Sequence, residues 1–280
     1  MKLGVYSICL PDLTPAQGIA AAAAAGYAGV EWRVGDLPAP GDAPGFFRGN
    51  RCTVPPDPAA VAAVARETRA AGLKVIGLGV YIDHGDVGGA KAALRLAAGA
   101  DVPWIRLRAP WRDGSSRYGA QFAAAVEFFS RVAELAERYG VMALIEQHQR
   151  TICPSASLTE RLVSRFDPAY IGVIYDAGNL VLEGYEDHRM ALDILGPYLA
   201  HVHVKNAAFD RPAGGGVWTP RWTPMDDGVL DVSALLAELD RAGYEGWISV
   251  EDFSTDRTPV DALRFNAEFL LGHGRKGTIS

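Results

Sequence analysis

The sequence has few cysteines, no long apolar run and no excess of positive charge. Its three cysteines, Cys9, Cys52 and Cys153, follow no CxxC or other metal-binding spacing, and their odd number does not suggest a disulfide framework. They indicate a reducing compartment. No apolar run approaches the roughly 20 residues of a membrane span, and the first residues, MKLGVYSICLPD, lack the length and cleavage site of a signal peptide. We therefore expect a soluble, cytoplasmic protein.

The charge balance is acidic, with 27 Lys and Arg against 33 Asp and Glu and a net charge of −6. Proteins that neutralise nucleic-acid phosphates need a basic surface, so neither nucleic acid nor a membrane is an expected partner. The 280 residues, 49% of them hydrophobic and 21% charged, are sufficient for a full hydrophobic core. We expect one domain that spans residues 1–280.

Short apolar runs alternate with helix-length segments along the chain, and glycines such as Gly72 and Gly140 separate the two. The runs are continuous, as in strands buried on both faces of a parallel sheet. Eight runs predict strands, at Lys2–Ile8, Gly29–Val34, Leu73–Val80, Trp104–Ala109, Val141–Glu146, Ile171–Asp176, His201–Lys205 and Trp247–Glu251. Eight such units in a chain slightly longer than about 250 residues predict an α/β TIM (β/α)8 barrel. The alternative, a doubly wound sheet, would carry a glycine fingerprint after its first strand, where SICLPDLTP has none.

Four of these strands carry a metal-binding side chain at or near their C-terminal ends: Glu146, Asp176, His203 and Glu251. In a TIM barrel these ends meet at one mouth. Three carboxylates there would repel one another, and some would stay protonated, unless a cation lay between them. Oxygen and imidazole ligands favour Mn²⁺, with Mg²⁺, Co²⁺, Fe²⁺ or Zn²⁺ as alternatives. For each of the four residues considered alone, the alternative is that it merely ends a strand and binds no metal.

Further polar residues share the inward faces of these strands. His148 lies two positions after Glu146 and therefore on its side, where proton transfer or substrate binding is the functional interpretation and a hydrogen-bonded neighbour the structural one. Lys205 shares a face with His203 and is a second candidate for substrate binding.

Arg106 and Arg108 share one face of the fourth predicted strand. Charged groups inside a barrel are costly unless they are paired. We therefore expect them to pair with acidic neighbours such as Glu31, while binding of an anionic or hydroxyl-rich substrate is the alternative.

Two loop-like segments and one polar residue complete the candidates. The Pro- and Gly-rich segment 35–56 is longer than most connections, which favours a functional role. Segment 206–230 follows His203, and we expect it over the mouth, with Trp218 stacking on a sugar or packed in an ordered lid. Asn179 either hydrogen-bonds the substrate or caps the turn that follows Asp176.

Four motifs in this order resemble the sugar phosphate isomerase/epimerase superfamily of xylose-isomerase-like TIM barrels: IEQH at 145–148, DAGN at 176–179, HVHVKN at 201–206 and GWISVE at 246–251. The resemblance implies that Glu146, Asp176, His203 and Glu251 bind a divalent metal and that Glu146 and Glu251 also act as acid and base. It implies an isomerase or epimerase of a keto-sugar or sugar phosphate, in which a proton is removed beside a carbonyl and the ion stabilises the enediolate.

Two departures from ketose 3-epimerases favour an alternative. Asn179 stands where those enzymes place a histidine, and 226–228 reads Asp-Asp-Gly instead of their GEG-like turn. His148 resembles the base of C-glycoside-cleaving enzymes, so a lyase, acting on 3-keto sugars or as a keto-cyclitol dehydratase, is the alternative. A DNA-repair endonuclease would need a zinc cluster and more than the 6 histidines present. A non-catalytic binding module, and a homo- or hetero-oligomer, stay open.

Overall fold

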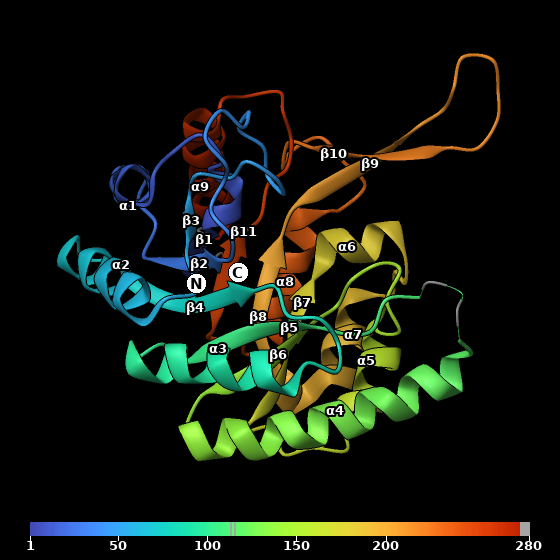
Figure 1. Cartoon of the computed structure of the whole chain (residues 1–280). Helices are drawn as coiled ribbons and strands as arrows, with labels where there is room; N and C mark the ends of the chain where they lie inside the picture. Colours follow the sequence, from blue (N-terminus) through green and yellow to red (C-terminus); the bar gives the residue numbers. More distant parts are fainter. Residues whose placement is uncertain (113, 115, 275–280) are drawn as a thin grey trace.

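The computed structural model describes residues 1–112, 114 and 116–274, and its core is a closed barrel of eight parallel strands (Figure 1). The sheet closes because β1 pairs with both β2 and β11, and the remaining strands follow in the order β11-β8-β7-β6-β5-β4-β2. The eight strands are β1 (Lys2–Tyr6), β2 (Gly29–Val34), β4 (Lys74–Val80), β5 (Trp104–Arg108), β6 (Met142–Glu146), β7 (Ile171–Asp176), β8 (Leu199–Val204) and β11 (Trp247–Val250). The predicted TIM barrel is confirmed.

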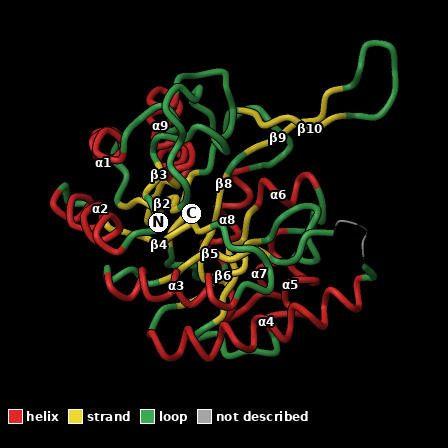
Figure 2. Tube along the Cα trace, in the orientation of Figure 1, coloured by secondary structure: helices red, strands yellow, loops and turns green. Residues whose placement is uncertain are grey.

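Helices surround the barrel on the outside (Figure 2). They are α1 (Pro15–Ala24), α2 (Pro58–Ala70), α3 (Val87–Gly99), α4 (Tyr118–Tyr139), α5 (Ala156–Val163), α6 (Ala177–Leu182), α7 (His188–Leu195), α8 (Val232–Arg241) and α9 (Pro259–Gly274), with short 3₁₀ turns at Ser7–Cys9 and Gly196–Tyr198. Local sequence fixes their starts: Thr14 and Gln17 form a reciprocal capping box at α1, and the Asp57 carboxylate caps α2. None of the described helices is long and apolar enough to cross a membrane.

The barrel interior is apolar at the N-terminal ends of the strands. Ile76, Trp104, Leu144 and Ile174 form a separate buried cluster there. Gly77 makes room for it, because a Cβ at this position would lie 2.4 Å from the Trp104 indole. The polar residues are therefore confined to the other end of the barrel, where the strands terminate.

Two segments differ from the expected loops. Segment 35–56 contains a short strand, β3 (Thr53–Val54), which pairs with β2. Segment 206–230 contains an antiparallel hairpin of β9 (Asn206–Asp210) and β10 (Thr219–Thr223), which projects away from the barrel at the upper right of Figure 1. The expectation that the whole segment covers the mouth is therefore wrong, because only the base of the hairpin stays there.

Candidate metal centre

The structure brings the four predicted ligands together at the C-terminal ends of neighbouring strands. Glu146 ends β6, Asp176 ends β7, His203 lies in β8 and Glu251 follows β11, and these four strands are adjacent in the sheet. All four side chains are buried, and each offers one oxygen or nitrogen within 4.8 Å of the others. The alternation of β8 accounts for the inward direction of His203, because Val202 and Val204 pack in the outer core.

The geometry around His203 fits a divalent cation. Its Nδ1 is buried and has no hydrogen-bond partner. It lies 3.6 Å from a Glu146 oxygen, 3.8 Å from an Asp176 oxygen and 3.7 Å from a Glu251 oxygen. These separations are too long for hydrogen bonds but are those of atoms that share an ion at roughly 2.1 Å. Three carboxylates and an imidazole therefore form a suitable donor set for a divalent metal.

Two buried cations compensate part of the negative charge. Arg106 donates through Nη1 to Glu146 Oε2 at 2.9 Å, and Lys205 donates to both Asp176 and Glu251. Although burial opposes ionisation, Arg106 and the His203 side chain hold the pKa of Glu146 well below its usual value. The expected pairing of Arg106 with an acidic neighbour is confirmed, although the partner is Glu146 on the adjacent strand β6 and not Glu31. The same expectation is wrong for Arg108, which forms no ion pair among the described residues.

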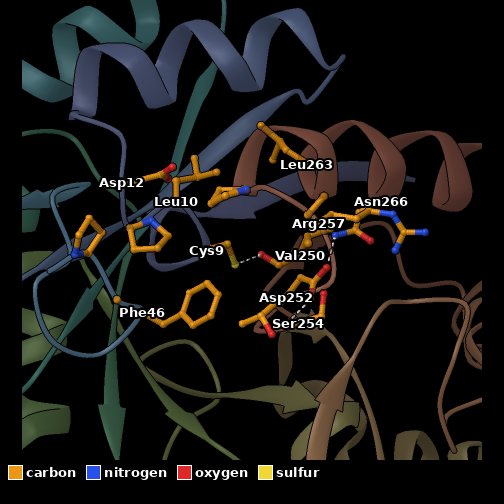
Figure 3. A pocket seen from close by; sticks show the side chains of 16 residues that line it. Cys9, Leu10, Asp12, Phe46, Val250, Asp252, Ser254, Arg257, Leu263 and Asn266 are labelled. Atoms are coloured by element: carbon orange, nitrogen blue, oxygen red, sulfur yellow. Dashed lines mark hydrogen bonds between the residues drawn. The ribbon is translucent and has the colours of Figure 1, made fainter.

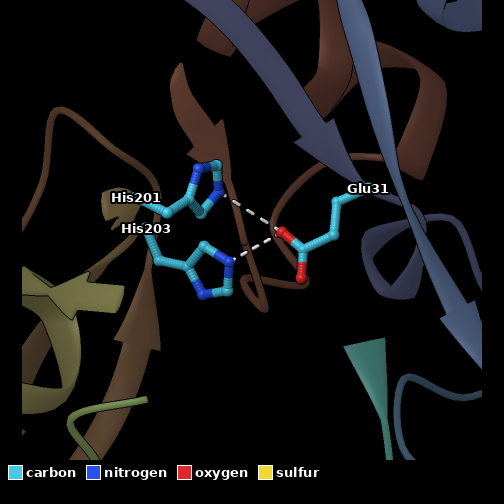
Figure 4. Close-up of side chains that lie close together, drawn as sticks. All are labelled: Glu31, His201 and His203. Atoms are coloured by element: carbon cyan, nitrogen blue, oxygen red, sulfur yellow. Dashed lines mark hydrogen bonds and ion pairs between the residues drawn. The ribbon is translucent and has the colours of Figure 1, made fainter. Parts of the chain in front are cut away.

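Glu31 binds the histidines of β8 (Figure 4). Its Oε2 accepts from His203 Nε2 at 2.8 Å and lies 3.5 Å from His201 Nε2. Burial alone would raise the pKa of Glu31, but these imidazoles hold it at about 2. The 2.8 Å distance is that of a hydrogen bond, so Glu31 fixes the His203 ring with Nδ1 facing the carboxylates. The sequence offered a signal for this role, since Glu31 is a charged residue in the centre of an apolar strand.

Glu31→Gln is expected to weaken Mn²⁺ binding by about 10- to 100-fold, the usual effect of removing a carboxylate that orients a ligating histidine. The matched control is Glu67→Gln, on the exposed surface of α2. Isothermal titration calorimetry of both variants checks this. Equal affinities would show that Glu31 does not orient His203.

Asn179 holds Asp176, one of the four predicted ligands. Its side-chain amide donates to Asp176 Oδ2 at 2.7 Å and to the Gln147 carbonyl at 3.1 Å, while its backbone N–H donates to Asp176 Oδ1 at 3.0 Å. The residue that caps α6 is therefore Asp176, whose carboxylate accepts from the Asn179 N–H, and the interpretation of Asn179 itself as the cap is wrong. The amide nitrogen is thereby engaged with protein groups, and a substrate contact by Asn179 stays a prediction.

His148 lies just beyond Glu146 with its ring edge against Trp111. Burial lowers the pKa of His148, although Glu146 partly offsets this effect. Nδ1 lies 2.8 Å from the Gln149 carbonyl, which only accepts, so Nδ1 carries the proton and Nε2 has a free lone pair. His148 is thus a neutral imidazole beside two of the predicted metal ligands, Glu146 and Asp176. Its predicted catalytic role stays a prediction.

Trp218 lies far along the hairpin and is 55% exposed. It faces a shallow depression with Phe209 and Val229. Trp222, in contrast, lies at the mouth, where its ring centroid is 5.4 Å from Lys205 Nζ and 5.6 Å from the Phe253 ring. Of the two tryptophans, the structure therefore brings Trp222 to the site, and a substrate contact by Trp218 stays a prediction.

A cavity of about 410 Å³ lies beside the centre, between the loops that follow β1 and β11 (Figure 3). Its wall includes Cys9, Phe46 and Asp252. Asp252 accepts hydrogen bonds from the Ser254 N–H at 2.7 Å and the Asn266 amide at 2.8 Å. Asp252 therefore stabilises the β11–α9 connection and does not join the ligands, although it follows Glu251 directly.

Metal affinity is expected to rise with pH. Burial raises the pKa of Glu251 to about 7, and the nearby Glu146 and Asp176 add to this, although Lys205 and His203 oppose it. Burial alone would lower the pKa of His203, but Glu31 and Glu251 raise it well above its usual value. An ion must displace the His203 proton and, below about pH 7, the Glu251 proton.

As the pH is raised, the apparent Kd for Mn²⁺ is therefore expected to fall by about 100-fold per pH unit below pH 7, where two protons are released. Just above pH 7, where only one proton is released, it is expected to fall by about tenfold per unit. Calorimetry in buffers of different ionisation enthalpy counts the protons directly. An affinity that does not change between pH 6 and 8 would contradict the assignment of these two groups.

Comparison with known proteins agrees with the fold. Residues 19–273 match the family model described as "Xylose isomerase-like TIM barrel". An inosose dehydratase of Geobacillus thermodenitrificans is 31% identical over 139 residues, which cover 45% of each chain. The chain spans about half the length of the curated relatives it matches.

Two solved structures share the fold over nearly the whole chain. An L-ribulose 3-epimerase has a TM-score of 0.75 at 14% identity and covers 98% of this chain and 95% of its own. The probable 3-DHS dehydratase of Bacillus anthracis involved in petrobactin synthesis has a TM-score of 0.73 at 16% identity. The match covers 97% of this chain and 99% of that protein. These likenesses concern the fold alone, whereas the family model spans most of the sequence, and the chain therefore belongs to the xylose isomerase-like TIM barrel family.

Proposed function

We propose that the protein is a divalent-metal-dependent lyase that removes water from a cyclic keto-polyol, such as a keto-cyclitol. The observation that carries the proposal is the buried set of four ligands around the unpartnered His203 Nδ1. The similarity to inosose dehydratases favours elimination over the return of the proton to carbon. The expectation of an isomerase or epimerase therefore becomes the alternative.

Glu146, Asp176, His203 and Glu251 would hold the ion. A divalent cation bound there would polarise the carbonyl and the adjacent hydroxyl of the substrate and lower the pKa of the neighbouring C–H. Mn²⁺ is the proposed ion, because three carboxylates with one imidazole suit it well.

The protein residues supply the proton transfers. A carboxylate oxygen of Glu146 or Glu251 removes the proton from the carbon beside the carbonyl, and the electron pair of that C–H bond forms the C=C bond. The hydroxyl on the next carbon leaves with its bonding pair and one proton, as water. His148 Nε2 is unprotonated, and its imidazole is close enough to Glu146 to feel its charge, so it accepts the proton that the carboxylate removed from carbon and delivers that proton to the leaving hydroxyl.

Proton NMR in D₂O tests this proposal with Mn²⁺-loaded protein and inosose, compared with a ketohexose. The expected result is an unsaturated ketone formed from inosose only when metal is present. Solvent deuterium at the carbon beside the carbonyl, with no loss of water, would instead support the epimerase or isomerase alternative. If neither the unsaturated ketone nor deuterium exchange is observed, the dehydratase proposal is contradicted, and a binding module or the cleavage of C-glycosides remains.

A further inference from the structure

Three arginines surround Tyr81 beside the metal centre. Arg33 extends from β2, Tyr81 follows β4, and Arg106 and Arg108 lie in β5. The Cζ atoms of Arg33, Arg106 and Arg108 lie 4.7, 4.9 and 5.7 Å from the Tyr81 ring centroid. Three positive charges thus share one aromatic ring at the mouth of an acidic protein.

Only one of these charges is neutralised. Arg106 pairs with Glu146, whereas among the described residues no carboxylate oxygen lies within 4.0 Å of the Arg33 or Arg108 guanidinium. Arg33 is 9% exposed and donates only to neutral acceptors, Thr53 Oγ1 at 2.8 Å and the Phe47 carbonyl at 3.3 Å. Its Nε is buried and has no partner. Burying a charge without a counter-ion is costly, which indicates that an anion completes the site.

Space for such an anion is present. Arg33 and Tyr81 line a cavity of about 570 Å³ together with residues of the 35–56 segment, among them Arg48, whereas Arg108 contacts the Tyr81 ring without lining this cavity. The carboxylates of Asp36 and Asp42 also border it, but both residues are exposed and neither forms an ion pair with Arg33. Arg108 is half-buried, and burial together with Arg106 lowers its pKa, which is the expected effect of positive charge without a close counter-ion.

The arginine site adjoins the metal centre through two contacts. Arg106 lies over the Tyr81 ring and donates to the ligand Glu146 at 2.9 Å. The Tyr81 hydroxyl lies 3.2 Å from the Tyr6 hydroxyl, and the Tyr6 ring stacks on His203 at 5.8 Å. These contacts link the Tyr81 ring, which Arg33 and Arg108 also contact, to Glu146 and His203 of the proposed metal site.

We propose that Arg33 and Arg108 bind an anionic group of the substrate, a carboxylate or a phosphate, and so select acidic keto-sugars over neutral ones. The planar guanidinium forms two parallel hydrogen bonds to either group. This inference rests on the proposed function for the identity of the substrate, but the anion site itself can be tested without any turnover.

The first test uses sulfate on metal-free protein. Sulfate, compared with chloride at equal ionic strength, is expected to raise the Tm of the wild type and of the control Arg95→Gln, an exposed arginine on α3. Arg33→Gln and Arg108→Gln are each expected to weaken sulfate binding by about tenfold or more. Equal stabilisation of all four proteins, or of none, would overturn the proposal. Arg108→Gln keeps the test valid if Arg33→Gln fails to fold, since Arg33 also holds the 35–56 segment.

The second test compares substrates of one carbon skeleton: a keto-sugar phosphate, a keto-sugar carboxylate and the neutral keto-sugar. The kcat/KM preference for one of the two anionic forms is expected to fall by about tenfold in Arg108→Gln, mainly through KM. The more affected form identifies the anion. An unchanged preference would overturn the inference while leaving the proposed function intact, whereas absence of turnover with every substrate would contradict the proposed function and leave the sulfate result standing.

Discussion

Glu251→Gln is expected to lower kcat by about 10²- to 10⁴-fold at saturating Mn²⁺, the usual effect of removing a general acid or base. The substitution keeps the size of the side chain but removes an oxygen that can ligate the ion and accept a proton. Glu251 is 2% exposed and sits within 3.7 Å of His203 Nδ1, so no solvent group can replace it. Glu146→Gln is expected to have a comparable effect.

Activity must be measured together with bound metal, because the glutamine is also a weaker ligand. The matched control is Glu245→Gln, an exposed glutamate just before β11. If the variant binds Mn²⁺ and retains activity within about threefold of wild type, Glu251 does not take part in the proton transfers.

Lys205→Met is expected to destabilise the metal-free protein by about 3–5 kcal/mol, the usual cost of leaving a buried charge without its partner. Lys205 is 2% exposed and donates to both Asp176 and Glu251. Although burial lowers it, these carboxylates raise the pKa of Lys205, so the ammonium remains charged. Its loss leaves the carboxylates to repel one another.

Mn²⁺ is expected to recover most of this loss, because the cation takes over the neutralising role of the ammonium. Urea denaturation without Mn²⁺ measures the loss in the free energy of unfolding, and urea denaturation with Mn²⁺ measures how much of it the ion recovers. The exposed Lys91→Met is the control. Equal destabilisation in the two conditions would show that Lys205 acts through packing of its alkyl chain instead of through its charge.

The barrel and the proximity of Glu146, Asp176, His203 and Glu251 could be predicted because both depend only on the order of strands and helices along the chain. Parallel strands alternate with helices, and the C-terminal end of each strand necessarily reaches the same mouth. A residue that ends a strand can therefore be placed without knowledge of any long-range contact.

Contacts across the barrel interior could not be predicted in this way. Glu31 lies on β2 and His203 on β8, which are not neighbours in the sheet, and their approach depends on strand stagger and side-chain length. Arg106 likewise selects Glu146 over Glu31, because the adjacent strand β6 is within reach of its guanidinium. The sequence did carry a signal for the hairpin, because the segments NAAFD and TPRWT flank the glycine-rich turn at 211–218.

The β9–β10 hairpin sits in the chain between β8 and β11, which carry two of the four ligands, yet in the described part of the chain its strands pair only with each other. Insertions or deletions at its tip consequently leave the register of the barrel unchanged. The length and sequence of this arm can therefore vary without displacing the buried carboxylates and histidines at its base.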